Sequence, residues 1–307
     1  MSIVFAGTPQ NAAITLLELV RSGAPISLVL TRPDAAIGRK AIVTPSPVAQ
    51  VATELGIPTI KTNVLSDETL NELKARKIDF GLVVAFGVLL KPNALSALPK
   101  GWFNLHYSLL PKWRGAAPVQ HALMSGEVET GVTLFQIDEG MDTGPIISQL
   151  PTRVQQGESA GDLLARLTNL GISVLVENVP RIFAGLIELS PQSNQDATFA
   201  PKLHKDDAKL DFTQSAKANE NLVRAMNPEP GAWTLSKGLP LKIHEARAIN
   251  ADLEVGSLTF FDGRVIVGCG AGALELGLVQ PSGKTRMSAK DWFRGLPDKA
   301  IQLGIYE

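Results

Sequence analysis

The sequence predicts an α/β fold, a mostly parallel sheet with helices on both faces, followed by a smaller β-rich domain. Three observations predict it. Short apolar runs alternate with stretches of helical periodicity over the first part of the chain. Those runs are nearly continuous, as in strands that helices bury on both faces. The last third of the chain shows short alternating runs instead, which are typical of a small β-rich domain.

The elements of the first part follow in regular order. A strand is predicted at residues 3–6, a helix at 11–21 and a second strand at 26–30. Helices are also predicted at residues 46–55, 66–77 and 162–184, and strands at residues 80–86, 102–105, 132–137 and 145–150. Ser66 suits the N-cap of its helix, because its hydroxyl can accept a hydrogen bond from a backbone N–H of the first turn. Asp67 and Glu68 in that turn favour the helix dipole. This order is typical of a Rossmann-like sheet, which binds ligands at the carboxyl ends of its strands.

The composition changes after the last of these helices. Residues 190–198 are rich in Ser, Pro, Gln, Asn and Asp, which is typical of a linker. We therefore predict a first domain at residues 1–189, a linker at 190–206 and a second domain at 207–307. Within the second domain a helix is predicted at residues 214–226 and strands at 241–246, 256–261, 264–268 and 274–279. Strands of this length and spacing suit a partly open, OB-like β-barrel, although a generic small barrel fits the pattern as well.

The composition also excludes several classes of protein. The 307 residues are 45% hydrophobic and 19% charged, which suits a packed globular protein rather than a disordered one. No apolar run is long enough for a membrane span, so no membrane partner is expected. The single cysteine, Cys269, excludes an internal disulfide and indicates a reducing, cytoplasmic environment. With a net charge of −1, any polyanion must bind to local basic patches.

Several motif matches fail in their context. Residues 157–161 fit a nucleophile elbow, but the segment before Ser159 is polar, and Ser159 with Asp162 suits a helix N-cap pair. Residues 282–285 resemble the end of a phosphate loop, yet the preceding glycine, Gly277, is one residue too far away. No two of the four histidines lie at metal-ligand spacing, so no metal is expected.

One group of residues resists a purely structural explanation. Asn104 and His106 lie two residues apart at the end of a predicted strand, so their side chains share one face. Asp142 lies in a loop between two later strands, flanked by Gly140 and Gly144. An amide, an imidazole and a carboxylate suit acyl transfer to an amine that attacks directly: the first two can donate to an oxyanion, and the carboxylate can orient the histidine or manage protons. A turn-forming Asn, a buried His and a capping Asp remain the structural alternative.

The sequence around these residues resembles the folate-dependent formyltransferases, and within them the branch that acts on methionyl-tRNA. The similarity rests on residues 104–118, NLHYSLLPKWRGAAP, and on residues 138–144, DEGMDTG. It extends to residues 5–9, 31–34, 38–40, 45–48, 129–133, 227–233, 283–284 and 287–289, and thus over nearly the whole chain. The resemblance implies that the chain transfers the formyl group of 10-formyltetrahydrofolate to the α-amine of methionine on initiator tRNA, a step of translation initiation.

The resemblance also implies roles for individual residues. Asn104 and His106 would stabilise the oxyanion, and Asp142 would position His106 and assist proton transfer. Folate contacts are implied for Ser108, Leu109, Leu110, Pro111, Phe86 and Gly87. Contacts to tRNA are implied for Arg39, Lys40, Lys284, Arg286, Lys290 and Arg294. In this interpretation a folate is the formyl donor and no metal takes part. The first domain binds the folate and the second domain contacts the tRNA. The protein is expected to be a monomer.

Other functions remain open from the sequence alone. A formyltransferase that acts on an amino-sugar nucleotide would keep the trio but would need neither Arg39 and Lys40 nor the second domain. A tRNA-binding protein without catalytic activity would use the second domain alone. A serine hydrolase that uses Ser159 is a third class, which substitution of that serine would test.

Overall fold

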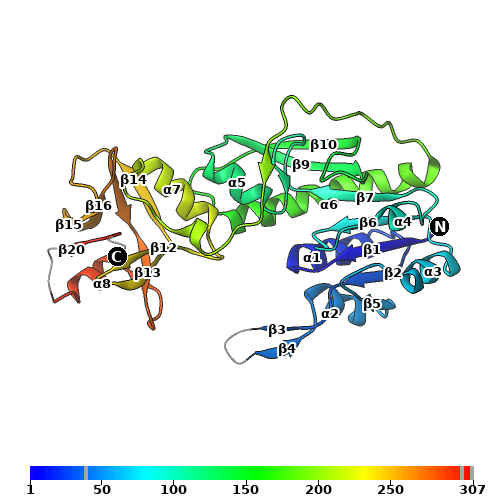
Figure 1. Cartoon of the computed structure of the whole chain (residues 1–307), viewed down its shortest axis with the longest axis horizontal. Coiled ribbons are helices and arrows are strands. Elements are labelled where there is room, and N and C mark those ends of the chain that lie inside the picture. The colour runs from blue at the N-terminus through cyan, green and yellow to red at the C-terminus, as the bar shows by residue number, and fades with distance from the viewer. Residues whose placement is uncertain (38–40, 298–300, 305–307) are drawn as a thin grey trace. The chain divides into compact units, whose positions relative to one another are not determined.

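The computed structural model describes residues 1–37, 41–297 and 301–304 (Figure 1). The chain forms two compact units. The first comprises Met1–Gly115, Glu129–Arg153 and Leu164–Phe199, and the second comprises Ala116–Val128, Val154–Leu163 and the residues from Ala200 onward. Two short segments of the first 189 residues therefore belong to the second compact unit. The division into domains with a linker at 190–206 remains a prediction.

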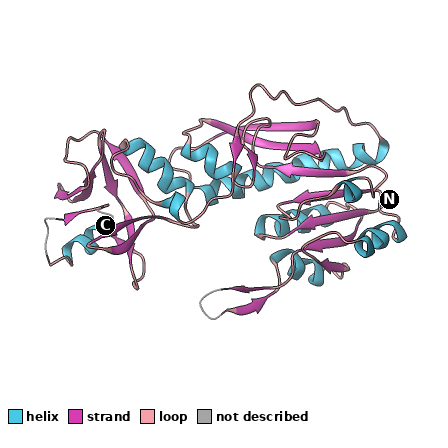
Figure 2. Cartoon of the chain, viewed as in Figure 1, coloured by secondary structure: helices cyan, strands magenta, loops and turns pink. Residues whose placement is uncertain are grey.

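A seven-stranded sheet in the order β10-β9-β7-β6-β1-β2-β5 forms the first unit (Figure 1). Figure 2 shows strands and helices in different colours in the same view. Its strands are β1 (Ile3–Gly7), β2 (Ile26–Thr31), β5 (Thr59–Lys61), β6 (Phe80–Val84), β7 (Trp102–His106), β9 (Glu129–Gln136) and β10 (Ile146–Arg153). All run parallel except β9, which is antiparallel to both of its neighbours. The mostly parallel sheet predicted from the sequence is confirmed.

The direction of β9 follows from the length of its connection to β10. Only residues 137–145 separate the two strands, which is shorter than the crossover of a dozen or more residues that parallel neighbours need. The continuous apolar pattern of β9 reflects burial rather than direction, because five successive residues from Gly131 to Phe135 are buried. The loop between these two strands carries Asp142.

Helices cover both faces of the sheet. They are α1 (Gln10–Arg21), α2 (Pro47–Glu54), α3 (Asp67–Ala75), α4 (Pro92–Leu95) and α6 (Ala160–Ala184). A core cluster that includes Leu73 of α3, Ala94 of α4 and Trp102 of β7 fills one face. On the other face Phe183 of α6 packs on Phe80 of β6, with ring centroids 4.8 Å apart. None of the helices among the described residues is long and apolar enough to cross a membrane.

The predicted cap of α3 is confirmed, since the Ser66 hydroxyl accepts a hydrogen bond from the Thr69 backbone N–H at 3.3 Å. Several short elements did not follow from the sequence pattern. Besides β5 and α4, they include β3 (Ala35–Ile37), β4 (Ile42–Thr44), β8 (Arg114–Gly115) and β11 (Phe199–Ala200). β3 and β4 form an antiparallel pair. Arg39 and Lys40 lie outside the described residues.

The second unit contains two antiparallel sheets and short helices. The helices are α5 (Pro118–Met124), η1 (Asp206–Ala208), α7 (Ala216–Ala225) and α8 (Ala289–Arg294). One sheet is β12 (Ala232–Ser236), β13 (Leu239–Ile243), β18 (Leu278–Pro281) and β19 (Met287–Ser288). The other is β14 (Ala246–Ile249), β17 (Ala273–Leu276), β16 (Arg264–Gly268), β15 (Ser257–Phe261) and β20 (Ile301–Gln302).

Two corners join these sheets. The predicted strand at residues 241–246 bends after Ile243 and supplies β13 to one sheet and β14 to the other. The predicted strand at 274–279 likewise breaks at Gly277, whose backbone N–H donates to the Glu245 carbonyl at 2.8 Å. Strands that change sheet at such corners enclose a single core. The β-rich second domain predicted from the sequence is confirmed.

Candidate active site

The centre of the large sheet offers a site at the carboxyl ends of its strands. From β1 the chain moves outward through β2 to β5, then returns to β6 beside β1 and moves the other way to β7. Open α/β sheets bind ligands at such a reversal of strand order. The loops after β1 and β6 are tied together there, because the Thr8 hydroxyl donates to the Phe86 carbonyl at 2.9 Å.

Asn104 and His106 lie at the end of β7, at this edge of the sheet. The alternation of a strand places both side chains on one face, as predicted. His106 is 5% exposed, whereas Asn104 is half-buried. Among the residues that the structure describes, none bonds to the side-chain amide of Asn104. The amide is therefore available to a ligand.

The loop between β9 and β10 holds Asp142 in a fixed conformation. The Asp138 carboxylate accepts a hydrogen bond from the Thr143 hydroxyl at 2.7 Å and so closes the loop on itself. Asp142 has a φ of +54°, a left-handed conformation that is unusual for a residue with a side chain. At Gly144 a Cβ atom would lie 1.8 Å from the Gln136 carbonyl oxygen, so only glycine fits. The loop geometry thus depends on the residues that sequence analysis singled out.

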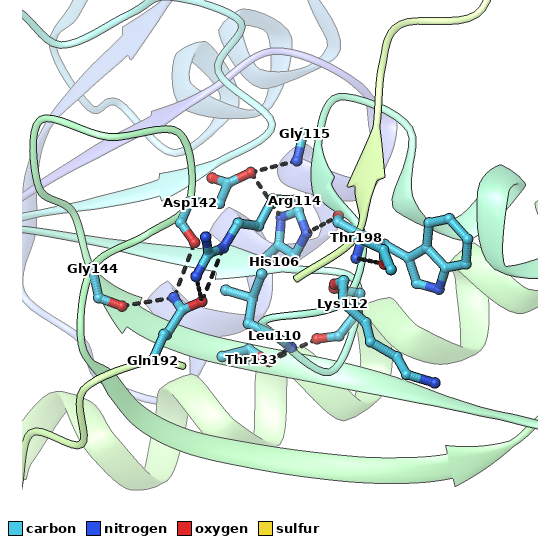
Figure 3. A network of polar contacts seen from close by, with 12 residues as sticks. His106, Leu110, Lys112, Arg114, Gly115, Thr133, Asp142, Gly144, Gln192 and Thr198 are labelled. Carbon is cyan, nitrogen blue, oxygen red and sulfur yellow. Dashed lines mark hydrogen bonds and ion pairs between the residues drawn. The ribbon is translucent and has the colours of Figure 1, made fainter. Parts of the chain in front are cut away.

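His106 and Asp142 meet in this structure (Figure 3). The Nδ1 atom of His106 lies 3.7 Å from Oδ2 of Asp142. The same carboxylate oxygen accepts a hydrogen bond from the Gly115 backbone N–H at 2.7 Å, which fixes its direction. The structure therefore brings together the imidazole and the carboxylate that the sequence suggested would share a pocket.

The second ring nitrogen of His106 determines what the first can do. Nε2 lies 2.9 Å from the Trp113 carbonyl oxygen. Because a carbonyl only accepts, we assign the proton of the neutral ring to Nε2, which leaves the lone pair on Nδ1 toward Asp142. Burial lowers the pKa of His106, and the nearby carboxylate and the bond to Trp113 offset this only in part. His106 is thus suited to accept a proton at Nδ1, and it can donate to an oxyanion from Nδ1 only once protonated.

A second layer of contacts surrounds this pair, and the sequence did not reveal it. The Arg114 guanidinium is buried and donates to Oε1 of Gln192 from Nη2 at 2.8 Å and from Nε at 3.2 Å. Nε2 of Gln192 donates to the carbonyl oxygens of Asp142 at 2.9 Å and Gly144 at 2.7 Å. Gln192 lies in the segment whose composition indicated a linker, so its own surroundings in the sequence did not indicate this contact. The one sequence signal that could have indicated it is Arg114, a basic residue for which the sequence offered no structural role.

Comparison with protein-family models identifies the chain. The family model described as Formyl transferase matches residues 1–179, and the model described as Formyl transferase, C-terminal domain matches residues 202–297. The chain belongs to the formyl transferase family. The family resemblance inferred from the sequence is confirmed, and the chain is an enzyme that transfers formyl groups.

Relatives of this formyltransferase match it over its full length. A protein from Clavibacter sepedonicus named methionyl-tRNA formyltransferase is 44% identical over 303 residues, which are 98% of this chain and 99% of the relative. A protein of the same name from Paenarthrobacter aurescens (strain TC1) is 43% identical over 305 residues, with 98% and 99% of the two chains covered.

Solved structures share the fold of this formyltransferase. An N-formyltransferase from Helicobacter canadensis, in complex with folinic acid and dTDP-3-aminofucose, superposes with a TM-score of 0.70 at 22% identity over 91% of this chain and 98% of that one. HypX from Aquifex aeolicus, in complex with tetrahydrofolic acid, superposes with a TM-score of 0.64 at 16% identity over 99% of this chain and 50% of that one. At these identities the likeness establishes the fold alone.

The loop at residues 108–111 of this formyltransferase is held from within the protein. Ser108 is buried, and its hydroxyl donates to the Lys112 carbonyl at 2.6 Å. Leu110 is buried too: its N–H donates to the Thr133 hydroxyl at 3.2 Å and its carbonyl accepts from Nε2 of Gln149 at 2.8 Å. Leu109 and Pro111 are half-buried. The folate contacts implied for these four residues remain predictions, and the Ser108 hydroxyl is already engaged.

The loop after β6 of this formyltransferase carries the other two residues assigned to folate. The Phe86 side chain is 1% exposed and packs in the core, so it presents only its backbone. Gly87 is exposed at a φ of +75°, which favours glycine. Leu89 follows, 80% exposed, and Met141 in the Asp142 loop is 65% exposed. Sequence analysis missed these two apolar side chains, because the sequence of a loop does not show which of its apolar residues are exposed.

The basic residues assigned to tRNA in the second unit lie on two elements. Lys284 and Arg286 are exposed in the connection between β18 and β19, and Lys290 and Arg294 are exposed on α8. Their contacts with tRNA remain predictions, as do those of Arg39 and Lys40 outside the described residues.

The segments at residues 157–161 and 282–285 belong to a helix cap and to a strand connection. Ser159 and Asp162 cap α6 reciprocally: each backbone N–H donates to the other side chain at 3.2 Å. Residues 282–285 lie in the connection between β18 and β19 rather than before a helix, with Lys284 N–H donating to the Pro281 carbonyl at 3.0 Å. Within the described part of the chain, no group of His, Cys, Asp and Glu is arranged to hold a metal.

Proposed function

We propose that this formyltransferase transfers the formyl group of 10-formyltetrahydrofolate to the α-amino group of methionine on initiator methionyl-tRNA. The observation that carries the proposal is the full-length similarity to methionyl-tRNA formyltransferases, 43–44% identical over 98% of the chain in both relatives. That similarity spans the catalytic unit and the strand-rich unit alike, as expected if both serve the same reaction.

The proton chemistry follows from the environment of His106. An amine must lose a proton to form an amide bond, and the unprotonated Nδ1 of His106 can accept it. The Asp142 carboxylate at 3.7 Å then stabilises the imidazolium by its opposite charge. The same Nδ1–H can afterwards return the proton to the nitrogen that leaves the formyl carbon. One imidazole thus serves both proton transfers, and the oxyanion depends mainly on the Asn104 amide.

The residues of this edge of the sheet fit a folate. The folate supplies the formyl carbon and a nitrogen as leaving group. Asn104 has an amide without a partner in the described structure, suited to the formyl oxygen. Leu89 and Met141 expose apolar side chains that suit the flat face of a pterin ring. Ser108, Leu109, Leu110, Pro111, Phe86 and Gly87 complete the proposed folate site, with Ser108 and Phe86 contributing backbone groups.

The tRNA would be bound by basic side chains of both parts of the chain. We assign phosphate contacts to Arg39, Lys40, Lys284, Arg286, Lys290 and Arg294. In this proposal residues 1–189 form the folate-binding catalytic domain, 190–206 the linker and 207–307 the tRNA-contacting domain. The enzyme acts as a cytoplasmic monomer.

Transfer of a labelled formyl group tests the proposal. Labelled 10-formyltetrahydrofolate is incubated with charged initiator methionyl-tRNA and, in a parallel reaction, with an amino-sugar nucleotide. We expect the label on the methionyl-tRNA, with a loss of about 100-fold or more in kcat for Asp142→Asn. Preference for the amino sugar would reassign the acceptor, and full activity of Asp142→Asn would refute the catalytic role of the carboxylate. Binding of tRNA without any transfer would support a non-catalytic protein.

A further inference from the structure

We propose that Gln192 is a positioning residue for Asp142, with Arg114 fixing the direction of its side-chain amide (Figure 3). The inference rests on the proposed function, because it assigns Gln192 a role through a carboxylate that takes part in the reaction. It assigns a role in the active site to a residue of the segment at 190–206, which the sequence predicts only as a linker.

The direction of the Gln192 amide follows from its partners. Its Oε1 atom accepts two hydrogen bonds from the Arg114 guanidinium, at 2.8 and 3.2 Å. Its Nε2 atom faces two carbonyl oxygens, which can only accept. A flipped amide would place an oxygen against the two carbonyls and an NH₂ group against the guanidinium, so all four contacts would become repulsive. Arg114 therefore selects one orientation of the Gln192 amide.

The two carbonyls belong to Asp142 itself and to Gly144, on either side of Thr143. Asp142 has a left-handed backbone, at a φ of +54°. Such a conformation persists at a residue with a side chain only where the surroundings hold it. Gln192 supplies two bonds to the loop at this point, at 2.9 and 2.7 Å. Without them the loop is free to relax and to carry the carboxylate with it.

The residues of one short strand hold both the carboxylate and the backbone carbonyl of Asp142 in place. Arg114 and Gly115 form β8. The Gly115 N–H binds the carboxylate oxygen that faces His106, at 2.7 Å. The Arg114 side chain binds the amide that holds the Asp142 carbonyl. The backbone and the carboxylate of Asp142 are thus both held by contacts that start from two adjacent residues. Such an arrangement is expected of a support that fixes the position of a reacting group.

Asn194 provides a matched control. Its Oδ1 atom accepts a hydrogen bond from Nη1 of Arg114 at 2.9 Å, so it shares the guanidinium with Gln192. Its described side-chain bond goes to Arg114 and not to the Asp142 loop. If Arg114 and its partners only anchor the chain segment, substitution of Asn194 and of Gln192 should have similar effects.

The activity test uses Gln192→Ala, Gln192→Glu and Asn194→Ala in the full-length enzyme. We expect Gln192→Ala to lower kcat about 10- to 100-fold with little change in the KM for folate, and Asn194→Ala to remain near wild type. Gln192→Glu keeps the acceptor for Arg114 and gains an ion pair, but it turns a carboxylate toward two carbonyls. It should lose at least as much kcat as Gln192→Ala while its melting temperature is maintained, whereas an anchoring role alone predicts full activity.

The Asp142→Asn background separates positioning from structure. If Gln192 acts through the carboxylate, Gln192→Ala should add less than about threefold to the loss already caused by Asp142→Asn. A structural defect would instead multiply the two losses. A full additional tenfold loss in the double variant would overturn the inference.

An activity-independent readout completes the test. NMR titration of labelled histidine gives the pKa of His106, assigned by its absence in His106→Gln. Because the Asp142 carboxylate raises this pKa, Gln192→Ala should lower it, and Asn194→Ala should leave it unchanged. If the wild type transfers no formyl group, the proposed function fails and this titration alone decides the inference. If the wild type is active but Gln192→Ala changes neither kcat nor the pKa of His106, only the inference fails.

Discussion

The imidazole of His106 faces the carboxylate of Asp142 through Nδ1, at 3.7 Å, while its Nε2 is engaged by the Trp113 carbonyl at 2.9 Å. This arrangement leaves one nitrogen for proton transfer and uses the other to hold the ring. It assigns most of the oxyanion stabilisation to Asn104, since His106 has no proton at Nδ1 until the amine provides one.

The activity should be lost in acid as His106 is protonated. Burial lowers the pKa of His106 below its ordinary value of 6.5, so the acid limb of kcat assigned to this group should lie below 6.5. In Asp142→Asn the carboxylate that raises this pKa is absent, and the limb should move to still lower pH. Single-turnover rates measured against pH, together with NMR titration of His106, check both shifts. An acid limb that moves to higher pH in Asp142→Asn would contradict this role of the carboxylate.

The same group should make the fold sensitive to acid. The unfolded chain binds a proton to His106 at the ordinary pKa of 6.5, whereas the folded protein binds it only at lower pH. The unfolded state therefore holds more protons between the two pKa values, and stability should fall as pH drops through 6.5 toward the lower value. Chemical denaturation of the wild type and His106→Gln against pH measures this contribution, which should be smaller in the variant.

Asn104→Ala should remove activity and leave stability intact. Loss of a single oxyanion donor typically costs about 10²–10³-fold in kcat. Because the Asn104 amide has no partner among the described residues, its removal should change the free energy of unfolding by about 0.5 kcal/mol or less. Asn178→Ala is the opposite control: that side chain is fully buried and donates to the Val174 carbonyl at 2.8 Å. It should destabilise the fold and spare kcat, as measured by urea denaturation and steady-state kinetics.

Gly144→Ala should disrupt the Asp142 loop. The new Cβ would lie 1.8 Å from the Gln136 carbonyl oxygen, so the chain must move, at a cost of about 1–3 kcal/mol in stability and most of the activity. Gly185→Ala is the control for glycine replacement, since it has open space around it and a φ of +68°, and should cost only about 1 kcal/mol. Equal activity in the two variants would show that the loop conformation is not required.

Local patterns allowed part of this molecule to be predicted from sequence. The periodicity of apolar residues placed six of the seven strands of the large sheet, all but β5. Strand alternation placed Asn104 and His106 on one face. Contacts between residues that lie far apart in the sequence could not be predicted. Arg114 and Gln192 are separated by 78 positions, and the polar composition around Gln192 is equally typical of a free linker. The tautomer of His106 depends likewise on the path of the backbone at Trp113, which no spacing of side chains encodes.

Ser159→Ala should affect stability and not catalysis. Ser159 and Asp162 form a reciprocal cap on α6, and loss of such a cap costs about 1 kcal/mol. Thermal denaturation should detect this loss, while kcat for formyl transfer stays at the wild-type value. Covalent labelling of Ser159 by a fluorophosphonate would overturn the assignment of this serine as a cap.

Lys284→Ala and Lys290→Ala should weaken tRNA binding mainly through electrostatics. Both side chains are exposed, so their removal should leave the fold unchanged. If each contacts one phosphate, the slope of log K against log salt should fall by about 1 per substitution, and KM for tRNA should rise without a change in kcat. Arg21→Ala is the control, because this exposed arginine of α1 already pairs with Glu18 at 2.7 Å. Salt slopes that match the control in both variants would mean that the two lysines are solvated and that other basic residues bind the tRNA.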